Sequence, residues 1–345
     1  MRLLIITQKV DKEDPILGFF HNWILELSKK IEKISVICLQ KGKYDLPENV
    51  KIYSLGKEHG GNKVKYIKNF FNLILNLRKE YNSVFVHMNQ EYVLLGGPFW
   101  KIMRKKIFLW RNHPSGNFFT VIAVWLSDKV FCTSRFAFVV KYEETSLMPV
   151  GIDTERFTIN DLGLKKKNSI LFLGRVSPIK RPGLLIEALN ILKNRGVDFV
   201  CDFYGSPLSK DEGYFNALKK RTAELGLNKQ INFYKAVANY ETPKIYNEHD
   251  IFVNLTPTGS FDKTILEAAA CGCVLVTTNQ SLSGEIDGRM IVEKEGSEDI
   301  AEKMNFWLNI EEEEKKKASD RLQKYVLKNH SLDVLIEKLC TIIKK

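Results

Sequence analysis

An apolar segment, a short basic loop and a helical pattern follow one another in Ile170-Leu-Phe-Leu-Gly-Arg-Val-Ser-Pro-Ile-Lys-Arg-Pro-Gly-Leu-Leu-Ile-Glu-Ala-Leu189. The unbroken apolar run before Gly174 is typical of a strand that is buried on both faces of a parallel sheet. Gly174 and Pro178 mark a turn, and apolar residues then recur at helical spacing. The segment therefore predicts a strand, a loop and a helix, the repeating unit of parallel α/β sheets.

The same alternation of strand and helix occurs in two series along the chain. The first series predicts strands at 3–7, 34–39, 83–87, 106–110 and 129–133, with helices near 21–30 and 64–79. The second predicts strands at 169–173, 198–204, 231–233, 251–255 and 274–277, with helices near 181–194, 213–225, 242–248 and 264–271. We therefore expect an α/β protein with two Rossmann-like, doubly wound domains, 1–150 and 151–330. Ligands of such sheets bind beyond the carboxyl ends of the strands, at a cleft between the two domains.

Composition and length agree with a folded two-domain protein. The chain has 345 residues, of which 44% are hydrophobic and 27% are charged. Its six cysteines lack the spacing of a zinc site or of a disulfide framework, so we expect reduced thiols in a cytoplasmic protein. The first apolar run is too short for a signal peptide. The longest run, 118–126, is about half of the ~20 residues that span a bilayer.

The net charge of +11 is concentrated in the first half of the chain. Residues 1–150 hold 23 Lys and Arg against 13 Asp and Glu, whereas residues 151–345 hold 29 against 28. A basic half indicates an anionic partner, such as a phospholipid surface or a lipid-phosphate acceptor. Residues 63–78 and 99–110 mix apolar side chains with cations, as interfacial membrane contacts do. Ordinary packing on a sheet and a generally lysine-rich surface are the alternatives, and no motif of a nucleic-acid-binding protein is present.

Two loops in the second half carry residues suited to an anionic ligand. Arg175 and Lys180 lie five positions apart where the first strand of that half ends, and such a pair can neutralise a diphosphate. Asn254–Thr277 runs from a strand through a Gly/Ser/Thr loop into a helix, whose amino terminus is a ready anion site. Glu267 falls one turn inside that helix, where a carboxylate among apolar residues needs hydroxyls or a cation. A solvated basic loop and a surface acid are the simpler interpretations of these residues.

These segments resemble the retaining glycosyltransferases of the GT-B fold, in the class called glycosyl transferases group 1 or glycosyltransferase family four. The resemblance rests on Pro149–Phe157, Gly174-Arg175 with Lys180, Phe233–Val237, Tyr246–Val253 and Leu266–Gly272. It covers nearly the whole chain, and the order and spacing of the landmarks are more specific than any one of them. It implies that domain 1–150 binds the acceptor, that a helix at about 331–345 packs back on it, and that domain 151–330 binds a nucleotide sugar.

The resemblance also implies roles for particular residues. Arg175 and Lys180 would hold the donor phosphates, Glu267 would bond the ribose, and His113 would face the reacting sugar. The donor-binding set is Glu267, Gly174, Gly259, Ser260, Phe261, Asp262, Lys263, Thr264 and Val237. The acceptor side is Gly18, His21 and His87. Gly18-Phe-Phe-His-Asn-Trp23 matches the glycine-containing loop of the family, and it lacks the GxGxxG pattern of a dinucleotide site.

Two positions depart from the family pattern. Gly259 stands where the family usually has a second Glu, eight residues before the ribose-binding one, so Asp262 or a backbone group would replace that contact. Lys235 stands where many members have Gly, near the strand that binds the base. These departures leave the sugar and the nucleobase of the donor open.

The expected function is transfer of a sugar from a nucleoside diphosphate to a hydroxyl acceptor with retained anomeric configuration, in cell-envelope polysaccharide or glycolipid synthesis. No DxD triplet is present, so we expect no metal and no cofactor, with Arg175, Lys180 and a helix amino terminus meeting the leaving-group charge. We expect no nucleic-acid partner, and a cytoplasmic protein that contacts the inner face of the membrane. A nucleotide-sugar epimerase of the same fold and a non-catalytic nucleotide-binding scaffold are the alternatives.

Overall fold

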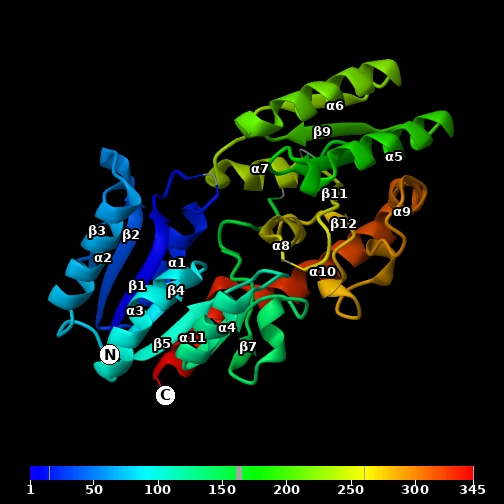
Figure 1. Ribbon diagram of the computed structural model, residues 1–345. Helices are drawn as coiled ribbons and strands as arrows, with labels where there is room; N and C mark the ends of the chain where they lie inside the picture. Colours follow the sequence, from blue (N-terminus) through cyan, green and yellow to red (C-terminus); the bar gives the residue numbers. More distant parts are fainter. Residues whose placement is uncertain (15, 161–164, 260, 345) are drawn as a thin grey trace. The chain divides into compact units, whose positions relative to one another are not determined.

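The computed structural model describes residues 1–14, 16–160, 165–259 and 261–344. The chain forms two compact units, of which one is Met1–Gly151 with Leu332–Lys345 and the other is Ile152–Ser331 (Figure 1). The first unit is thus built from both ends of the chain. Each unit is an α/β assembly around its own parallel sheet.

In the described part of the first unit, seven parallel strands pair in the order β3-β2-β1-β4-β5-β6-β7. The strands are β1 (Arg2–Val10), β2 (Lys33–Lys41), β3 (Val50–Ser54), β4 (Ser83–His87), β5 (Lys106–Trp110), β6 (Lys129–Cys132) and β7 (Thr145–Leu147). The helices are α1 (Gly18–Ser28), α2 (Lys63–Asn76), α3 (Gln90–Ile102), α4 (Phe118–Leu126) and α11 (Leu332–Lys344).

Helices cover both faces of this sheet because alternate strand residues point to opposite sides. In β1, Leu3 and Ile5 share a buried cluster with residues of α1 and α11. Leu4 and Ile6 share the opposite cluster with residues of α2, α3 and α4. The sheet is therefore doubly wound, and α2, α3 and α4 lie together on one of its faces.

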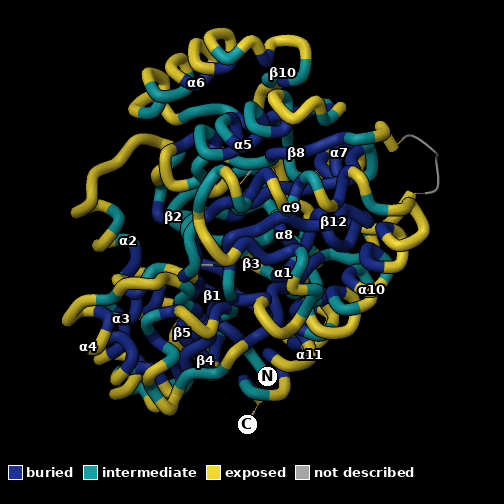
Figure 2. Tube along the Cα trace, turned by 90° about the vertical axis from the view of Figure 1, so that its right-hand side faces the viewer, coloured by how far each residue is buried: buried dark blue, intermediate teal, exposed yellow. Residues whose placement is uncertain are grey.

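In the described part of the second unit, five parallel strands pair in the order β10-β9-β8-β11-β12. The strands are β8 (Ser169–Leu173), β9 (Val200–Tyr204), β10 (Ile231–Tyr234), β11 (Ile251–Asn254) and β12 (Val274–Thr277). The helices are α5 (Pro182–Asn194), α6 (Glu212–Glu224), α7 (Thr242–Asn247), α8 (Lys263–Ala270), α9 (Ser297–Asn309) and α10 (Glu312–His330). Figure 2 shows the central strands and α8 buried, whereas α6 is largely exposed.

The expected fold class is confirmed, and each of the ten expected strands is found. The sequence did not predict β3 and β7, nor helices α3, α4 and α9. The two strands stand at opposite edges of their sheet. β3 is mostly half-buried and β7 has three residues, so neither has the continuous apolar run by which the central strands were recognised.

Two further expectations concern the cysteines and the membrane. All six cysteines lie in the described ranges, and they are free and buried. Among the described residues, no helix is long and apolar enough to cross a membrane. The longest apolar run of the sequence, 118–126, is the nine-residue helix α4.

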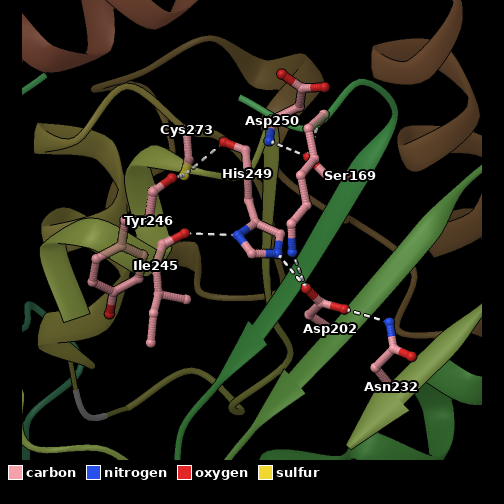
Figure 3. A network of polar contacts seen from close by, with 9 residues as sticks. Ser169, Asp202, Asn232, Ile245, Tyr246, His249, Asp250 and Cys273 are labelled. Carbon is pink, nitrogen blue, oxygen red and sulfur yellow. Dashed lines mark hydrogen bonds and ion pairs between the residues drawn. The ribbon is translucent and has the colours of Figure 1, made fainter. Parts of the chain in front are cut away.

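A buried polar network joins the strands of the second sheet around Asp202 (Figure 3). The Asp202 carboxylate accepts hydrogen bonds from Lys166 Nζ at 2.8 Å and Asn232 Nδ2 at 2.8 Å, and His249 Nε2 lies 3.1 Å away. His249 Nδ1 lies 2.7 Å from the carbonyl oxygen of Ile245. Both ring nitrogens of His249 therefore face oxygen atoms of the network.

The network stabilises the ionised form of Asp202. Burial by itself would raise the pKa of this carboxyl, but the hydrogen bonds from His249, Lys166 and Asn232 outweigh burial and hold the pKa well below its ordinary value of 3.8. A carboxyl whose pKa is lowered by folding stabilises the folded state above its ordinary pKa, and this contribution is lost as the pH falls below it.

We predict that Asp202→Asn lowers the free energy of unfolding near pH 7 by about 1–3 kcal/mol, because the buried ring of His249 and the exposed ammonium of Lys166 lose the carboxylate that they share. The difference in stability between variant and wild type should persist down to about pH 4. It should narrow below that pH, because the carboxyl group of the unfolded wild-type chain then becomes protonated. Urea unfolding at several pH values measures both effects. Glu187→Gln is the control, because the pair of Glu187 with Arg221 is exposed and should contribute little. Equal stability of Asp202→Asn and wild type near neutral pH would contradict the prediction.

Candidate functional site

The candidate residues of the second unit gather where β8 and β11 end. Gly174 follows β8 directly, and a short 3-10 helix, Pro178–Lys180, leads from its loop into α5. The loop after β11 leads into α8. Because β8 and β11 are paired in parallel, both loops begin at the same end of the sheet, where the strands have their carboxyl ends.

A close backbone approach fixes the start of the first loop. The Gly174 amide donates to the carbonyl oxygen of Tyr204 at 3.0 Å, which extends the pairing of β8 with β9 by one residue. A Cβ atom on Gly205 would lie 1.9 Å from the carbonyl oxygen of Gly174. Glycine at 205 therefore lets the two strand ends stay in contact just before Arg175.

Lys180 forms an ion pair with Asp262, across 82 positions of sequence. Asp262 also accepts from Asn254 Nδ2 at 3.0 Å and from Thr256 Oγ1 at 3.4 Å. Burial alone would raise the pKa of Asp262, but the Lys180 ammonium and these hydrogen bonds lower it below its usual value. The carboxylate is therefore charged and holds the end of Lys180 beside the amino terminus of α8.

Arg175 differs from Lys180 in its surroundings. Its side chain is exposed, and within the described ranges no hydrogen bond or ion pair of Arg175 is recorded. Near Lys180, by contrast, Asn254 Nδ2 contacts Asp262 and also lies 3.3 Å from Thr264 Oγ1, in the first turn of α8. Among the described residues, Lys180 is thus paired with a carboxylate and Arg175 is not.

Glu267 is buried inside α8, with 5% of its surface exposed. Asn239 Nδ2 donates to it at 3.4 Å and the Tyr246 hydroxyl at 3.3 Å. Burial raises the pKa of Glu267, and burial lowers the pKa of Lys263, which stands one turn earlier on the same helix. Each of these two groups opposes the shift of the other, because their charges are opposite.

Sequence reasoning missed Asn239 and Tyr246 as partners of Glu267. Tyr246 belongs to a segment that the family resemblance used as a landmark, so its position was marked but its role was not. Asn239 precedes α7 in a short 3-10 turn, Asn239–Glu241, which has no apolar pattern of its own. Only the packing of α7 against α8 brings these groups to the carboxylate.

The loop between β11 and α8 has a distinctive backbone at Gly259. Its φ is +141°, a region that residues with a side chain rarely adopt. A glutamate at this position, as in the usual family pattern, would strain the loop as it is built here. Ser260 lies outside the described residues. Phe261 is buried, and its ring lies 6.1 Å from that of His330. Val237 is half-buried between β10 and the turn at Asn239.

The candidate residues of the first unit are divided between its core and its loops. His87 ends β4 and is buried, with its ring stacked on Phe20 at 3.8 Å between centroids and its Nδ1 3.3 Å from Thr7 Oγ1. His113 is exposed in the loop between β5 and α4, where its Nδ1 accepts from the Ser115 amide at 3.0 Å. Packing with Phe20 and Thr7 is sufficient to account for the position of His87, whereas His113 is open to solvent.

Gly18 and His21 lie on α1, after the loop that follows β1. Gly18 begins the helix, and a Cβ atom there would lie 3.1 Å from the carbonyl oxygen of Lys12. His21 is buried and accepts a hydrogen bond from the Asp45 amide at 3.1 Å. Burial lowers the pKa of His21, so the neutral imidazole is favoured near pH 7.

The arrangement in the second unit suits a polar, anionic ligand. An ammonium, an exposed guanidinium and the first amides of α8 supply positive charge, and a buried carboxylate one turn further on can accept hydrogen bonds from hydroxyl groups. Among the described residues, no three His, Cys, Asp or Glu side chains are grouped closely enough to hold a metal ion.

Comparison with known proteins agrees with this geometry. Residues 155–326 match the family model described as glycosyl transferases group 1. The chain is 28% identical over 173 residues to the spore coat protein SA of Bacillus subtilis, which is 48% of this chain and 45% of the relative. It is 30% identical over 140 residues to the mannosylfructose-phosphate synthase of Agrobacterium fabrum, which is 40% of this chain and 31% of that protein. The matched region is thus less than half of each of these curated relatives.

The likeness to solved structures extends over the whole chain. The Anabaena protein Alr3699/HepE, solved in complex with UDP, has a TM-score of 0.80 and 15% sequence identity, and each chain is covered completely. At this identity the likeness establishes the fold, which is GT-B. The resemblance inferred from the sequence is confirmed, and residues 155–326 are a domain of the glycosyl transferases group 1 family.

Proposed function

We propose that the protein is a glycosyltransferase that moves a sugar from a nucleoside-diphosphate donor to a hydroxyl acceptor. The observation that carries the proposal is the gathering of Lys180, Asp262, Lys263 and Glu267 at the carboxyl ends of β8 and β11, inside the residues that match the family model. The mannosylfructose-phosphate synthase and HepE are what this chain is similar to; the activity of the whole protein is our inference.

The donor diphosphate would lie at the loop of Arg175 and Lys180 and the first turn of α8. Arg175 is exposed and can form forked hydrogen bonds to phosphate oxygens, and Lys180 supplies a point charge. The amides that begin α8 add partial positive charge at the same place. These groups would stabilise the negative charge that develops on the leaving nucleoside diphosphate, so no metal ion is required in this mechanism.

Glu267 would bind the donor ribose. Its carboxylate is buried and already receives the hydroxyl of Tyr246 and the amide of Asn239, and it can accept further hydroxyl donors. Asp262 would take over the contact to the sugar that the family makes through the glutamate absent at Gly259. Retention of anomeric configuration and use of no cofactor follow from the family resemblance and are part of the proposal.

The acceptor side is proposed to lie in the first unit, where His113 is exposed in a loop and Gly18 begins α1. The acceptor would be a hydroxyl group of a cell-envelope glycan or glycolipid, which agrees with the basic charge of that half. The protein would then work at the cytoplasmic side of the membrane. His21 and His87 are buried, so we propose that they shape this region rather than touch the acceptor.

The nucleotide is the first point to test. HepE has been solved with UDP-glucose, so UDP heads a thermal-shift panel that also contains GDP, ADP and CMP. We expect one diphosphate to raise the melting temperature, because a ligand that binds only the folded state stabilises it. Arg175→Ala should abolish this shift and lower transfer by about 10- to 1,000-fold.

A flat response to every nucleotide, or normal turnover of Arg175→Ala, would refute the proposal. Stabilisation without turnover on a broad panel of acceptors would indicate a nucleotide-binding scaffold. A change of the donor sugar in the absence of any acceptor would indicate an epimerase.

Lys180 has a structural role besides its proposed catalytic one, and the two can be separated. Lys180→Ala leaves the Asp262 carboxylate without its counter-charge, which should cost about 1–3 kcal/mol of stability. Lys180→Ala with Asp262→Ala removes both partners and should recover most of the lost stability, but not the activity. Arg175→Ala should leave the melting temperature nearly unchanged, because its side chain is exposed. Recovery of activity in the double variant would contradict the assignment of Lys180 to the donor phosphates.

Lys263 should set the pH dependence of nucleotide binding through Glu267. Burial already raises the pKa of Glu267, and Lys263→Met removes the charge that opposes the rise. More of the carboxyl is then protonated, so the affinity of the variant should begin to weaken at a higher pH than that of wild type as the pH is lowered, and should recover as the pH rises. Titration of the stabilising nucleotide at several pH values measures this. Lys244→Met is the control, because the side chain of Lys244 on α7 is exposed, and parallel pH profiles of Lys263→Met and wild type would contradict the prediction.

A further inference from the structure

Helix α4 has an unusual outer surface. Its residues, Phe118–Leu126, include no charged side chain, and Thr120, Ala123 and Val124 face the core. On the other side, 72% of Phe118 and 81% of Trp125 are exposed. A single exposed apolar residue is common in soluble proteins, but large aromatic side chains exposed on one short helix mark an interaction surface.

The exposed apolar surface continues over the neighbouring helices. α2, α3 and α4 share one buried cluster on the same face of the first sheet, and Figures 1 and 2 show them side by side. The ring of Phe71 on α2 lies 5.3 Å from that of Phe99 on α3. We call their solvent side the α2–α4 face, defined by the exposed residues Val64, Ile67, Phe99, Ile102, Phe118 and Trp125.

The opposite side of the same sheet provides an internal comparison. α1 and α11 cover it, and no large apolar side chain of α1 or of the described part of α11 is exposed. The two sides carry helices of similar length on one sheet, so the fold itself does not require apolar residues at the surface. The exposed apolar side chains therefore distinguish the α2–α4 face from the other side of the same sheet.

The charge of the α2–α4 face indicates what covers it. Helices α2, α3 and α4 together contain four lysines and one acidic residue, Glu91, and three of the lysines lie in the first two turns of α2. Two copies of the chain that met through this face would bring two positive surfaces together, which electrostatic repulsion disfavours. An anionic phospholipid surface offers both the opposite charge and an apolar interior. A row of exposed aromatic and aliphatic residues bordered by lysines is suited to such an interface.

A cavity extends the apolar surface inward at α2. Its volume is about 530 Å³, and its lining combines apolar residues of α2 and α3, such as Ile67 and Leu94, with the charged side chains of Lys63 and Glu91. Ile67 belongs both to the cavity and to the α2–α4 face. The α2–α4 face is therefore hollowed at this point, where apolar and charged side chains meet, as they do at the boundary between lipid headgroups and acyl chains.

We propose that the α2–α4 face binds the surface of an anionic phospholipid bilayer, with Phe118 and Trp125 entering the headgroup region. The lysines of α2, among them Lys65 and Lys68, contact lipid phosphates. Since α4 has nine residues, it lies on the bilayer and does not cross it. This contact goes beyond the proposed function, because it uses no donor-binding residue, and it would bring the first unit to an acceptor held in the membrane.

Tryptophan fluorescence tests the contact directly. All five tryptophans lie in the described ranges, and Trp23, Trp100, Trp110 and Trp307 are at most 4% exposed. Trp125 therefore dominates the solvent-exposed emission. We expect vesicles of phosphatidylcholine with about 30% phosphatidylglycerol to shift this emission to the blue. Pure phosphatidylcholine should have a much smaller effect, and added salt should reverse the shift.

Co-sedimentation of the full chain with the same vesicles compares variants. Phe118→Ser with Trp125→Ser should lower vesicle affinity at least about tenfold, because two large apolar side chains no longer enter the lipid. Lys65→Glu with Lys68→Glu should lower it specifically for anionic vesicles. Leu327→Ser is the matched control, since Leu327 is an exposed apolar residue of a helix in the second unit and should leave binding unchanged.

Absence of wild-type binding to anionic vesicles at low salt would overturn the proposal, as would equal binding by the Phe118 and Trp125 double variant. A dimer of the wild-type chain in light scattering that the same double variant abolishes would show instead that a second copy covers the face. None of these readouts needs turnover or nucleotide. Failure of the membrane proposal is therefore distinguishable from failure of the proposed transferase activity.

Discussion

The parallel pairing of β8 with β11 brings Lys180 and Asp262 together from positions 82 residues apart. Both strands have their carboxyl ends at the same end of the sheet, and a loop follows each of them. The cation on one loop therefore meets the carboxylate on the other. Removing either charge would leave its partner in a poorly solvated place, which is costly. This ion pair holds the loop of Arg175 against the first turn of α8. Glu267 lies further along the same helix.

The two ends of the second sheet use charge in different ways. Around Asp202, every strong donor is matched with an acceptor inside the unit, and the network ties β9 and β10 to the segment before β11. At the carboxyl ends of the strands, Arg175 is exposed and Glu267 is buried with weakly placed donors at 3.3–3.4 Å. A satisfied network stabilises a fold, whereas charges that are incompletely matched have capacity left for a ligand.

Local sequence determined which elements form and which residues carry charge beside them. Continuous apolar runs such as 83–87 and 169–173 identified central strands at their observed bounds, because strands buried on both faces tolerate little else. Arg175 and Lys180 were found because they closely follow one of these strands in the sequence. Glu267 was found because it lies in the helix after the loop that follows another strand. The family resemblance drew on these same patterns. The edge strands β3 and β7 and helix α3 lack such patterns, since solvent on one side relaxes the choice of residues.

Other features depended on contacts between distant segments, which no local pattern records. The sequence could not show that Lys180 is paired while Arg175 is exposed, or that Tyr246 and Asn239 reach Glu267. It placed Gly259 at a family glutamate position, but only the backbone, with φ at +141°, shows that a side chain would strain the loop there. Likewise, the apolar run 118–126 was evident from composition, whereas its exposed face became evident only when α4 was placed on the sheet. Burial and pairing are properties of packing, so the sequence by itself determined the elements and their chemistry, and the tertiary structure decided which groups meet and which remain exposed.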